Sequence, residues 1–341
     1  MPSQRGGRVF TNGHAAGILG TGSYLPDRVV SNAEVAEKVG VTPEWIERKT
    51  QIRERRYAAP HEATSDLAVC AAKLALDQAG ISVDRVDYII VSTSTPDSPQ
   101  PPTAALVQNM LGAPHAGCFD INVVCSGFPY GVGLAAALQS LNPGAYVLVI
   151  GADLYSRILN VADRATSVLL GDGAGAAVVG PVPLSYGVVS CGLHTRGDAH
   201  EYIRVDAGGS RIPTSHETVD TGGHNFTMQG RNVTSFVLDE VPPALAGLLR
   251  NAGIEADQVT HFVPHQPNGN LLDNLVTKAG LDHVTTHRTL QRYGNVGSAS
   301  VPVTLDVANQ AGAFADGDLL LLAGFGGGMS IGSCLLRWWS A

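Results

Sequence analysis

The chain has few charged residues and no excess of positive charge. Only 15% of its 341 residues are Asp, Glu, Lys or Arg, and the formal net charge is −8. A chain with this balance lacks the basic surface that binds nucleic acid or an anionic membrane. Its apolar runs, such as 319–325, are too short to span a bilayer. With 44% hydrophobic residues, the sequence predicts an ordinary soluble globular protein with a large core.

Cysteine is scarce and unpaired in sequence. The five cysteines are an odd number without a Cys-x-x-Cys motif, and with no secretory leader in view this predicts a reducing cytoplasm instead of a disulfide framework. Residues 1–13 are polar and contain glycine, so we expect a loose leader there. Four cysteines have no special setting and are expected in the core as small apolar residues: Cys70, Cys118, Cys191 and Cys334.

Cys125 is different, because a predicted buried strand meets an Ala/Gly-rich helical run, 131–138, close to this residue. The first turn of a helix offers unpaired N–H groups and the positive end of the macrodipole, which stabilise thiolate over thiol. The same amides can hold an oxyanion. Most cysteines in an apolar context are only small core residues, but this position predicts a nucleophile.

Strand-and-helix patterns recur at half the chain length. A strand predicted at 88–94, with its following helix, recurs about 172 positions later as a strand at 259–264 and its helix. The junction at Cys125 falls in the same way on 293–299. A period this long predicts an internally duplicated α/β fold, because solenoid repeats are far shorter. We expect mostly parallel sheets with helices on both faces.

The duplication divides the chain into halves at 14–185 and 186–341. If these halves pack about a pseudo-twofold axis, the loops after equivalent strands converge, which brings Cys125 toward His265 and Asn295. His265 ends an apolar strand and precedes a helix, although a lone histidine is more often a surface or core residue. Asn295 lies in a Gly-rich loop, where a turn residue in the left-handed conformation is as plausible as a catalytic one.

Two further segments invite interpretation. The motif Gly171-Asp-Gly-Ala-Gly-Ala176 matches a dinucleotide-binding pattern, but a strand, 177–179, follows it where a phosphate-binding helix would be needed. We therefore interpret the motif as a tight turn. The segment 186–235 is rich in Gly, Ser, Thr and His, and we interpret it as a lid and substrate-channel region.

Several motifs stand in order along the chain: Asp120-Ile-Asn-Val-Val-Cys-Ser-Gly-Phe128, Leu170-Gly-Asp-Gly-Ala-Gly-Ala-Ala177, Val263-Pro-His-Gln-Pro-Asn268, Gly294-Asn-Val-Gly-Ser-Ala299 and Phe325-Gly-Gly-Gly328, with Leu19–Pro26 and Glu44–Thr50 in addition. Together they resemble β-ketoacyl-acyl-carrier-protein synthase III, a family of the thiolase superfamily. The resemblance runs nearly end to end, and it implies an α/β thiolase fold, duplicated in five layers α-β-α-β-α, in a homodimeric cytoplasmic enzyme.

The resemblance implies Cys-His-Asn catalysis. Cys125 attacks an acyl thioester while the backbone N–H groups of Cys125 and Gly327 hold the oxyanion. His265 and Asn295 then donate hydrogen bonds to the enolate that forms when a malonyl thioester loses CO₂. The enolate carbon attacks the acyl group on Cys125 and gives a β-ketoacyl product.

The resemblance also implies the substrates and their contacts. Trp45 and Arg164 would sandwich the adenine of coenzyme A, and Asn268 and Phe325 are further substrate contacts. The substrates are an acyl-coenzyme A or acyl-carrier thioester and a malonyl thioester or another acyl acceptor. The family needs no metal, redox nucleotide or pyridoxal phosphate.

Three positions depart from the family pattern. Lys49 stands where an arginine usually follows the tryptophan, and an ammonium cannot stack as a guanidinium does. Asn270 replaces a basic residue that helps to dock an acidic acyl carrier protein. The loop 96–102 has no aromatic residue to cap the acyl pocket of a partner subunit. A substitute basic patch would have to come from other arginines, such as Arg231, Arg250 and Arg292.

These observations leave three classes of function. The first is a condensing acyltransferase of fatty-acid-like or polyketide biosynthesis. The second is a non-condensing acyltransferase that moves the acyl group from Cys125 to a hydroxyl or amine. The third is an inactive partner subunit or an unrelated Cys-His-Asn hydrolase, and the intact triad and the lack of a papain-like Cys-Gly-Ser-Cys-Trp motif argue against these. We expect a dedicated carrier, malonyl-coenzyme A or a small nucleophile as the acceptor.

Overall fold

The computed structural model describes residues 13–340, so the predicted leader, apart from Gly13, lies outside the described residues. The strands are β1 (His14–Tyr24), β2 (Arg28–Ser31), β3 (Glu54–Tyr57), β4 (Val86–Ser92), β5 (Gly117–Ile121), β6 (Tyr146–Leu154), β7 (Asp172–Pro183), β8 (Gly187–Thr195), β9 (Ile203–Val205), β10 (Phe226–Met228), β11 (His261–Pro264), β12 (Thr285–Thr286), β13 (Leu319–Gly326) and β14 (Ser330–Arg337).

The helices alternate with these strands. They are α1 (Asn32–Val39), α2 (Pro43–Thr50), α3 (Thr64–Ala79), α4 (Thr103–Leu111), α5 (Gly127–Leu141), α6 (His216–Asp220), α7 (Gly230–Ala252), α8 (Gly269–Lys278), α9 (Leu290–Tyr293) and α10 (Ser300–Gln310). Two short 3-10 turns, η2 (Val124–Ser126) and η6 (Gly297–Ala299), lead directly into α5 and α10. No helix among the described residues has the length and apolar character to cross a bilayer.

Two five-stranded sheets have the same strand order. The first runs β1-β7-β6-β4-β5 and the second runs β12-β11-β13-β14-β8, which is the same sequence of equivalent strands listed from the other end. The proposed division at 185/186 falls in the turn that joins β7 to β8. This shared topology is what a duplicated chain would produce.

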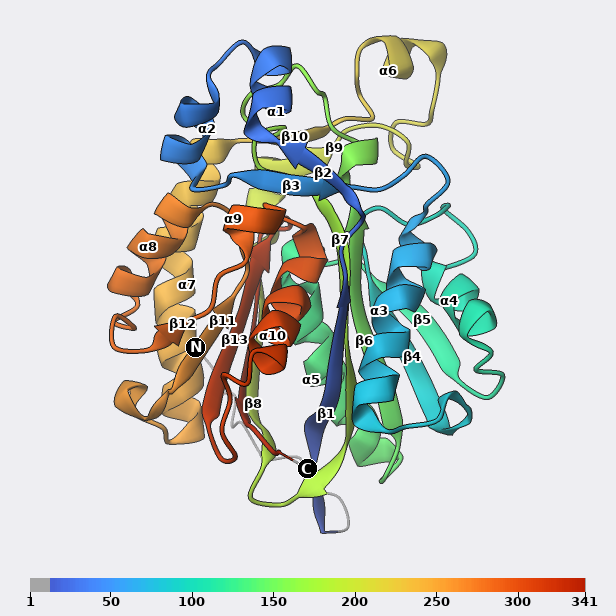
Figure 1. The fold of residues 1–341 in the computed structure, drawn as a ribbon, viewed down its shortest axis with the longest axis vertical. Coiled ribbons are helices and arrows are strands. Elements are labelled where there is room, and N and C mark those ends of the chain that lie inside the picture. Colours follow the sequence, from blue (N-terminus) through green and yellow to red (C-terminus); the bar gives the residue numbers. More distant parts are fainter. Residues whose placement is uncertain (1–12, 341) are drawn as a thin grey trace.

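The elements form the five layers that the resemblance implied. In Figure 1, α5 and α10 lie between the two sheets, α3 and α4 cover the outer face of the first sheet, and α7 and α8 cover that of the second. The central core joins Phe128 and Val301, from the two inner helices, to Val149 and Leu322, from the two sheets. Small residues allow this packing, because a Cβ at Gly131 would lie 2.5 Å from a methyl group of Val149.

The expectation of mostly parallel sheets was wrong. In each sheet, two pairings are parallel and two are antiparallel, the latter made by β1, β6 and β7 in the first sheet and by β13, β14 and β8 in the second. The physical reason is clearest at β13 and β14, which a short turn at 327–329 connects. Such a turn reverses the chain, whereas a parallel pairing needs a long crossover.

Two local interpretations also need correction. The motif at 171–176 is not a tight turn but lies mostly within β7, where a Cβ at Gly175 would lie 2.6 Å from the backbone nitrogen of Val303. Its glycines allow close approach of α10. Because the motif is part of a strand and no helix follows it directly, the rejection of a dinucleotide site stands. Of the four cysteines expected in the core, only Cys334 is fully buried; Cys70, Cys118 and Cys191 are half-buried.

Candidate active site

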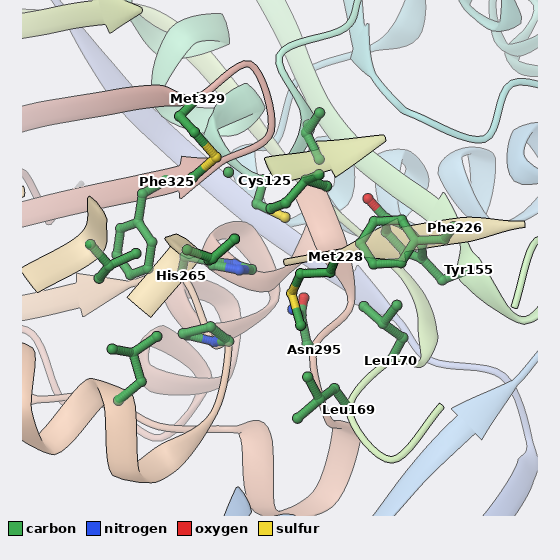
Figure 2. Close-up of a pocket in the computed structure, with 17 residues that line it drawn as sticks. Cys125, Tyr155, Leu169, Leu170, Phe226, Met228, His265, Asn295, Phe325 and Met329 are labelled. Carbon is green, nitrogen blue, oxygen red and sulfur yellow. The ribbon is translucent and has the colours of Figure 1, made fainter. Parts of the chain in front are cut away.

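Cys125, His265 and Asn295 come from distant parts of the chain and line one cavity. Cys125 lies in η2 between β5 and α5, His265 directly follows β11, and Asn295 lies between α9 and η6. All three are at least nine-tenths buried. Figure 2 shows the three side chains facing a common space, which has a volume of about 40 Å³. The structure therefore brings together the three residues that the sequence named as catalytic candidates.

The backbone before Cys125 is strained. Val124 has a φ of 51°, in the left-handed region that β-branched residues rarely adopt. The side chain of Asn122 supports this turn by accepting a hydrogen bond from the Val124 nitrogen at 3.4 Å. Strain of this kind persists where the surrounding structure enforces it, often at functional sites. Here the turn presents Cys125 at the start of α5, as the sequence predicted.

The ionisation of Cys125 differs from what the helix start alone led us to expect. Burial raises the pKa of the thiol above its ordinary value, and the negative charge of Asp153 raises it further. A hydrogen bond with Tyr155 lowers the pKa, but by less. Burial therefore outweighs the helix start, so that Cys125 is a thiol until a base or a substrate changes its surroundings.

His265 is neutral for a similar reason. Burial lowers the pKa of its imidazole to about 3 because the charged form cannot be solvated there. The Nδ1 atom is buried and has no hydrogen-bond partner among the described residues. The ring packs edge-on against Phe325, with centroids 5.3 Å apart. A neutral imidazole can both donate and accept a proton, which suits a group that faces a thiol and an incoming thioester.

Asn295 is oriented by its own loop. Its Oδ1 atom accepts a hydrogen bond from the Gly297 nitrogen at 3.0 Å, and its backbone is held by Leu169 and Gly171 through bonds of 2.8 and 2.9 Å. With Oδ1 engaged in this way, the amide NH₂ group (Nδ2) is the polar group that remains to face the cavity. Asn295 is thus a local turn residue, and its remaining Nδ2 group can donate a hydrogen bond into the cavity.

Glycines line the other side of Cys125. A Cβ at position 326 would lie 2.8 Å from the Cys125 nitrogen, and one at Gly327 would lie 3.0 Å from a methyl group of Val124. Any larger residue at 326 would cover the N–H group of Cys125. The sequence named Gly327 as the second oxyanion donor, and the structure places it in the turn between β13 and β14, next to Val124.

The remaining wall of the cavity is apolar. Tyr155 and Phe226 lie on one side of Cys125 and Phe325 lies on the opposite side (Figure 2). The rings of Tyr155 and Phe226 meet edge to face with centroids 5.4 Å apart. Ile203 and Met228, from the segment 186–235, complete this wall. Their position supports the interpretation of that segment as part of a substrate channel.

A larger groove of about 330 Å³ leads from the surface to the cavity. Trp45, Lys49, Arg164 and Asn268 line it, and Asn295 lines both spaces. Asn268 also caps α8, because its side chain accepts a hydrogen bond from the Leu271 nitrogen at 3.1 Å. Lys49 and Arg164 are exposed, and they are the basic side chains among the residues that line the groove.

Asn270, the position expected to carry a docking charge, has a structural role. Its side chain donates to the carbonyl oxygens of Arg48 and Lys49 at 3.1 and 2.8 Å, tying α8 to the end of α2. Arg231 and Arg250 lie at opposite ends of α7, about 28 Å apart along the helix axis. They cannot form one substitute patch of positive charge.

Sequence reasoning missed two residues beside this site. Asp153 is a fully buried carboxylate whose pKa burial raises to about 6, and Ser298 donates its backbone N–H group and its hydroxyl to it, each at 2.7 Å. A signal was present: Asn122 and Cys125 recur 173 positions later as Asn295 and Ser298. Aligning the two junctions residue by residue would have drawn attention to Ser298.

Two segments of the chain match models of one known family. Residues 119–197 match the family model "3-Oxoacyl-[acyl-carrier-protein (ACP)] synthase III", and residues 249–338 match its C-terminal counterpart. The chain is 51% identical to "Acetoacetyl CoA synthase NphT7" of Streptomyces sp. (strain CL190), over 94% of this chain and 98% of that protein. It is 43% identical to a beta-ketoacyl-[acyl-carrier-protein] synthase III of Caldanaerobacter subterraneus subsp. tengcongensis, over 95% and 98%.

Solved structures agree with these matches. The 3-oxoacyl-[acyl-carrier-protein] synthase III of Aquifex aeolicus VF5 superposes with a TM-score of 0.88 at 34% identity, over 95% of this chain and all of that one. The priming beta-ketosynthase from the R1128 polyketide biosynthetic pathway superposes with a TM-score of 0.88 at 35% identity, over 96% and 97%. The similarity thus extends over nearly the whole fold.

Proposed function

The chain belongs to the 3-oxoacyl-[acyl-carrier-protein] synthase III, or ketosynthase III, family of condensing enzymes, and we propose that it joins a short acyl group to malonyl-coenzyme A. The observation that carries the proposal is the small apolar cavity shared by Cys125, His265 and Asn295. Its volume of about 40 Å³ is close to that of one water molecule or methyl group. An acetyl group is therefore the donor that fits best, and the 51% identical relative is named an acetoacetyl-CoA synthase.

The first half-reaction loads Cys125. The groove beside Trp45 and Arg164 would take the coenzyme A part of the donor, and the acyl carbon would reach the thiol at its inner end. The thiol proton would pass to neutral His265, the sulfur would form a bond to the acyl carbon, and the coenzyme A thiolate would leave and take up that proton. The N–H groups of Cys125 and Gly327 would hold the oxyanion, each contributing about 3 kcal/mol.

The second half-reaction forms the carbon–carbon bond. A malonyl thioester in the same groove would lose CO₂, and the negative charge would move to its thioester oxygen. His265 and the amide NH₂ group (Nδ2) of Asn295 would donate hydrogen bonds to that oxygen. The enolate carbon would then attack the acyl carbon, the bond to Cys125 sulfur would break, and the released thiolate would take up one proton from solvent to restore the Cys125 thiol. Two fixed donors in a buried, mostly apolar cavity are well suited to this charge, because low dielectric strengthens each hydrogen bond.

Coenzyme A is the favoured carrier of the malonyl group. Docking of an acidic carrier protein depends on positive charge near the channel mouth. Asn270 supplies none, Arg231 and Arg250 are too far apart, and the whole chain has a net charge of −8. The groove has room for a thioester arm; Trp45 and Arg164 beside it would take the adenine of coenzyme A, and Lys49 would meet its phosphates.

The test is product analysis with acetyl-coenzyme A and malonyl-coenzyme A. We expect acetoacetyl-coenzyme A and one CO₂ for each turnover. Asn295→Ala should still form the acetyl adduct at a near-normal rate and His265→Ala should form it slowly, but both should release little CO₂. Transfer of acetyl to an added alcohol or amine without CO₂ release would favour the non-condensing alternative. Efficient turnover with malonyl on a generic carrier protein, strongly weakened by salt, would contradict the choice of coenzyme A.

The proposal includes a homodimer. β5 is the edge strand of the first sheet, where it pairs with β4 alone, and its residues 118–121 are only half-buried. An unpaired edge of this kind is either protected or used for association. Light scattering of the purified protein should give twice the mass of 35.5 kDa, whereas a monomer at working concentration would contradict this part of the proposal.

A further inference from the structure

Asp153 is an uncompensated carboxylate at the centre of the molecule. It lies near the end of β6, has no exposed surface, and makes no salt bridge within residues 13–340. A charged group in this position must be stabilised by hydrogen bonds, because burial without them costs several kcal/mol. The half-reactions proposed above do not use Asp153, so its presence needs another reason.

Five hydrogen bonds hold the Asp153 carboxylate, and they come from both halves of the chain. Its Oδ1 atom accepts from Ser94 N at 2.7 Å, Thr95 Oγ1 at 3.2 Å and Thr93 Oγ1 at 3.3 Å, which all lie in the loop after β4. Its Oδ2 atom accepts from the nitrogen and the hydroxyl of Ser298 at 2.7 Å each. The carboxylate therefore fixes η6 relative to the first half.

The turn η6 in turn fixes Asn295. Gly297 packs directly against the Asp153 carboxylate and the ring of Tyr155, where even a Cβ would collide with both. The nitrogen of Gly297 donates to Asn295 Oδ1 at 3.0 Å. A shift of Ser298 away from Asp153 would carry Gly297 with it and would rotate or release the Asn295 amide.

We propose that Asp153 is a positioning residue for the decarboxylation step, acting through Ser298 and Gly297 on the amide of Asn295. The inference rests on the proposed function, in which Asn295 donates to the enolate. Asp153 does not touch the substrate in this scheme. It sets the direction of a donor that must match the enolate oxygen, and it acts on the second half-reaction because Asn295 is not needed to load Cys125.

Asp153→Asn is the sharpest variant, since the amide has the same size and shape. It has only one acceptor oxygen, whereas the carboxylate serves two backbone N–H groups, those of Ser94 and Ser298, with different oxygens. In either orientation the amide NH₂ faces one of these N–H groups, so one donor is left unsatisfied and displaced. The change removes the link without leaving a cavity.

Asp306 provides a matched control. It is also a buried carboxylate, and it joins α10 to β1 by accepting from Thr21 Oγ1 at 2.7 Å and Ser23 Oγ at 2.6 Å. It does not line the cavity or bond to η6. Asp306→Asn should lower the melting temperature but leave both half-reactions, expressed per folded enzyme, at the level of the unmodified protein.

The experiment separates the two half-reactions. Intact-protein mass spectrometry follows the acetyl adduct on Cys125, and CO₂ release follows decarboxylation of malonyl-coenzyme A. For Asp153→Asn we expect adduct formation near that of the unmodified enzyme and a kcat for CO₂ release lower by about 100-fold, which is the cost of misplacing a catalytic group by about 1 Å. The KM for malonyl-coenzyme A should change little, because the groove is intact.

Each outcome decides between a positioning and a merely structural role. An equal loss in both half-reactions, or no loss beyond that of Asp306→Asn, would overturn the inference. If Asp153→Asn does not fold, Ser298→Ala removes one of the two bonds to Oδ2 and should show the same selective loss, smaller in size; unchanged CO₂ release would then overturn it. If the unmodified enzyme releases no CO₂, the proposed function fails, whatever the variants do.

Discussion

The turn before α5 and the turn before α10 have the same construction. Asn122 and Asn295, 173 positions apart, each accept a hydrogen bond from the nitrogen two residues later, at 3.4 and 3.0 Å. That later residue has a positive φ in both turns, 51° at Val124 and 57° at Gly297. The next residue is Cys125 in the first turn and Ser298 in the second. Duplication has thus produced two equivalent helix starts near the pseudo-twofold axis.

The two turns differ in what faces them. Asp153 stands opposite Ser298 and fills the space in front of its N–H group with a carboxylate oxygen at 2.7 Å. At the equivalent position, 173 residues later, the chain has Gly326, which has no side chain to cover the Cys125 nitrogen; a Cβ there would lie only 2.8 Å from it. The Ser298 turn therefore shows how this helix start binds a negative oxygen. In the proposed function, the substrate oxyanion takes the equivalent place at the Cys125 turn.

Replacement of Cys125 breaks this comparison most completely. Cys125→Ala should abolish the acyl adduct, because no other thiol of the described residues lines the cavity. Intact-protein mass spectrometry after incubation with acetyl-coenzyme A checks this. Cys334→Ala, which also removes a buried thiol, should keep the adduct. An adduct of full occupancy on Cys125→Ala would show that the nucleophile is elsewhere.

Replacement of Gly326 tests whether the N–H group of Cys125 holds the oxyanion. A methyl group at 326 would lie 2.8 Å from the nitrogen and 2.9 Å from the Cβ of Cys125, so Gly326→Ala should block the oxyanion and slow acylation by about 100-fold or more. Stopped-flow measurement of coenzyme A release gives this rate. Gly133→Ala is the control, because its Cβ would meet only ordinary contacts at 3.6 Å. A normal rate in Gly326→Ala would mean that the oxyanion lies on another side of Cys125.

The sequence predicted the repeat, the family and the residues that meet at the cavity, because each has a local signature. Cys125 stands at a strand-to-helix junction, His265 at a strand end and Asn295 in a Gly-rich turn, and these patterns depend on neighbours in the chain. Asp153 was missed for the opposite reason. A buried carboxylate whose partners lie 58 to 145 positions away leaves no pattern in its own segment.

The ionisation of Cys125 and the size of the cavity were also beyond the sequence. A helix start favours the thiolate, but desolvation, which depends on the whole fold, raises the pKa. The cavity wall combines Tyr155 from the first half with Phe226 from the second. Its volume depends on how these two rings meet, which no local pattern specifies.

Enlarging the cavity beside the Cys125 turn tests which residue limits the length of the acyl group. Phe226→Ala removes a ring that meets Tyr155 at 5.4 Å, so the preference for a hexanoyl over an acetyl donor should rise by about tenfold or more. Competition between the two donors, followed by adduct mass, measures this ratio. Phe314→Ala removes a buried ring outside the cavity and should leave the ratio unchanged. The same ratio in both variants would show that Phe226 does not limit chain length.

The smallest effect concerns two buried ionisable groups. His265 lines the cavity with Cys125, and Asp153 accepts hydrogen bonds from Ser298. Burial lowers the pKa of His265 from 6.5 to about 3 and raises that of Asp153 from 3.8 to about 6. For His265 the unfolded chain binds the extra proton, so its contribution to stability is present above pH 6.5 and is lost as the pH falls toward 3. For Asp153 the folded chain binds the extra proton, so stability is lost as the pH rises from 3.8 toward 6.

These opposite signs predict opposite changes in the two variants. Between about pH 4 and pH 6, His265→Asn should remove a slope in which stability rises with pH, and Asp153→Asn should remove one in which it falls, each at most about 1.4 kcal/mol per pH unit. Urea unfolding at several pH values measures both, with Asp306→Asn as the reference for a buried carboxylate outside the two turns. If the pH dependence of the unfolding free energy changes in the same direction in both variants, one of the two groups is solvated in the folded protein. The two turns would then differ in shape and not in the ionisation of the groups beside them.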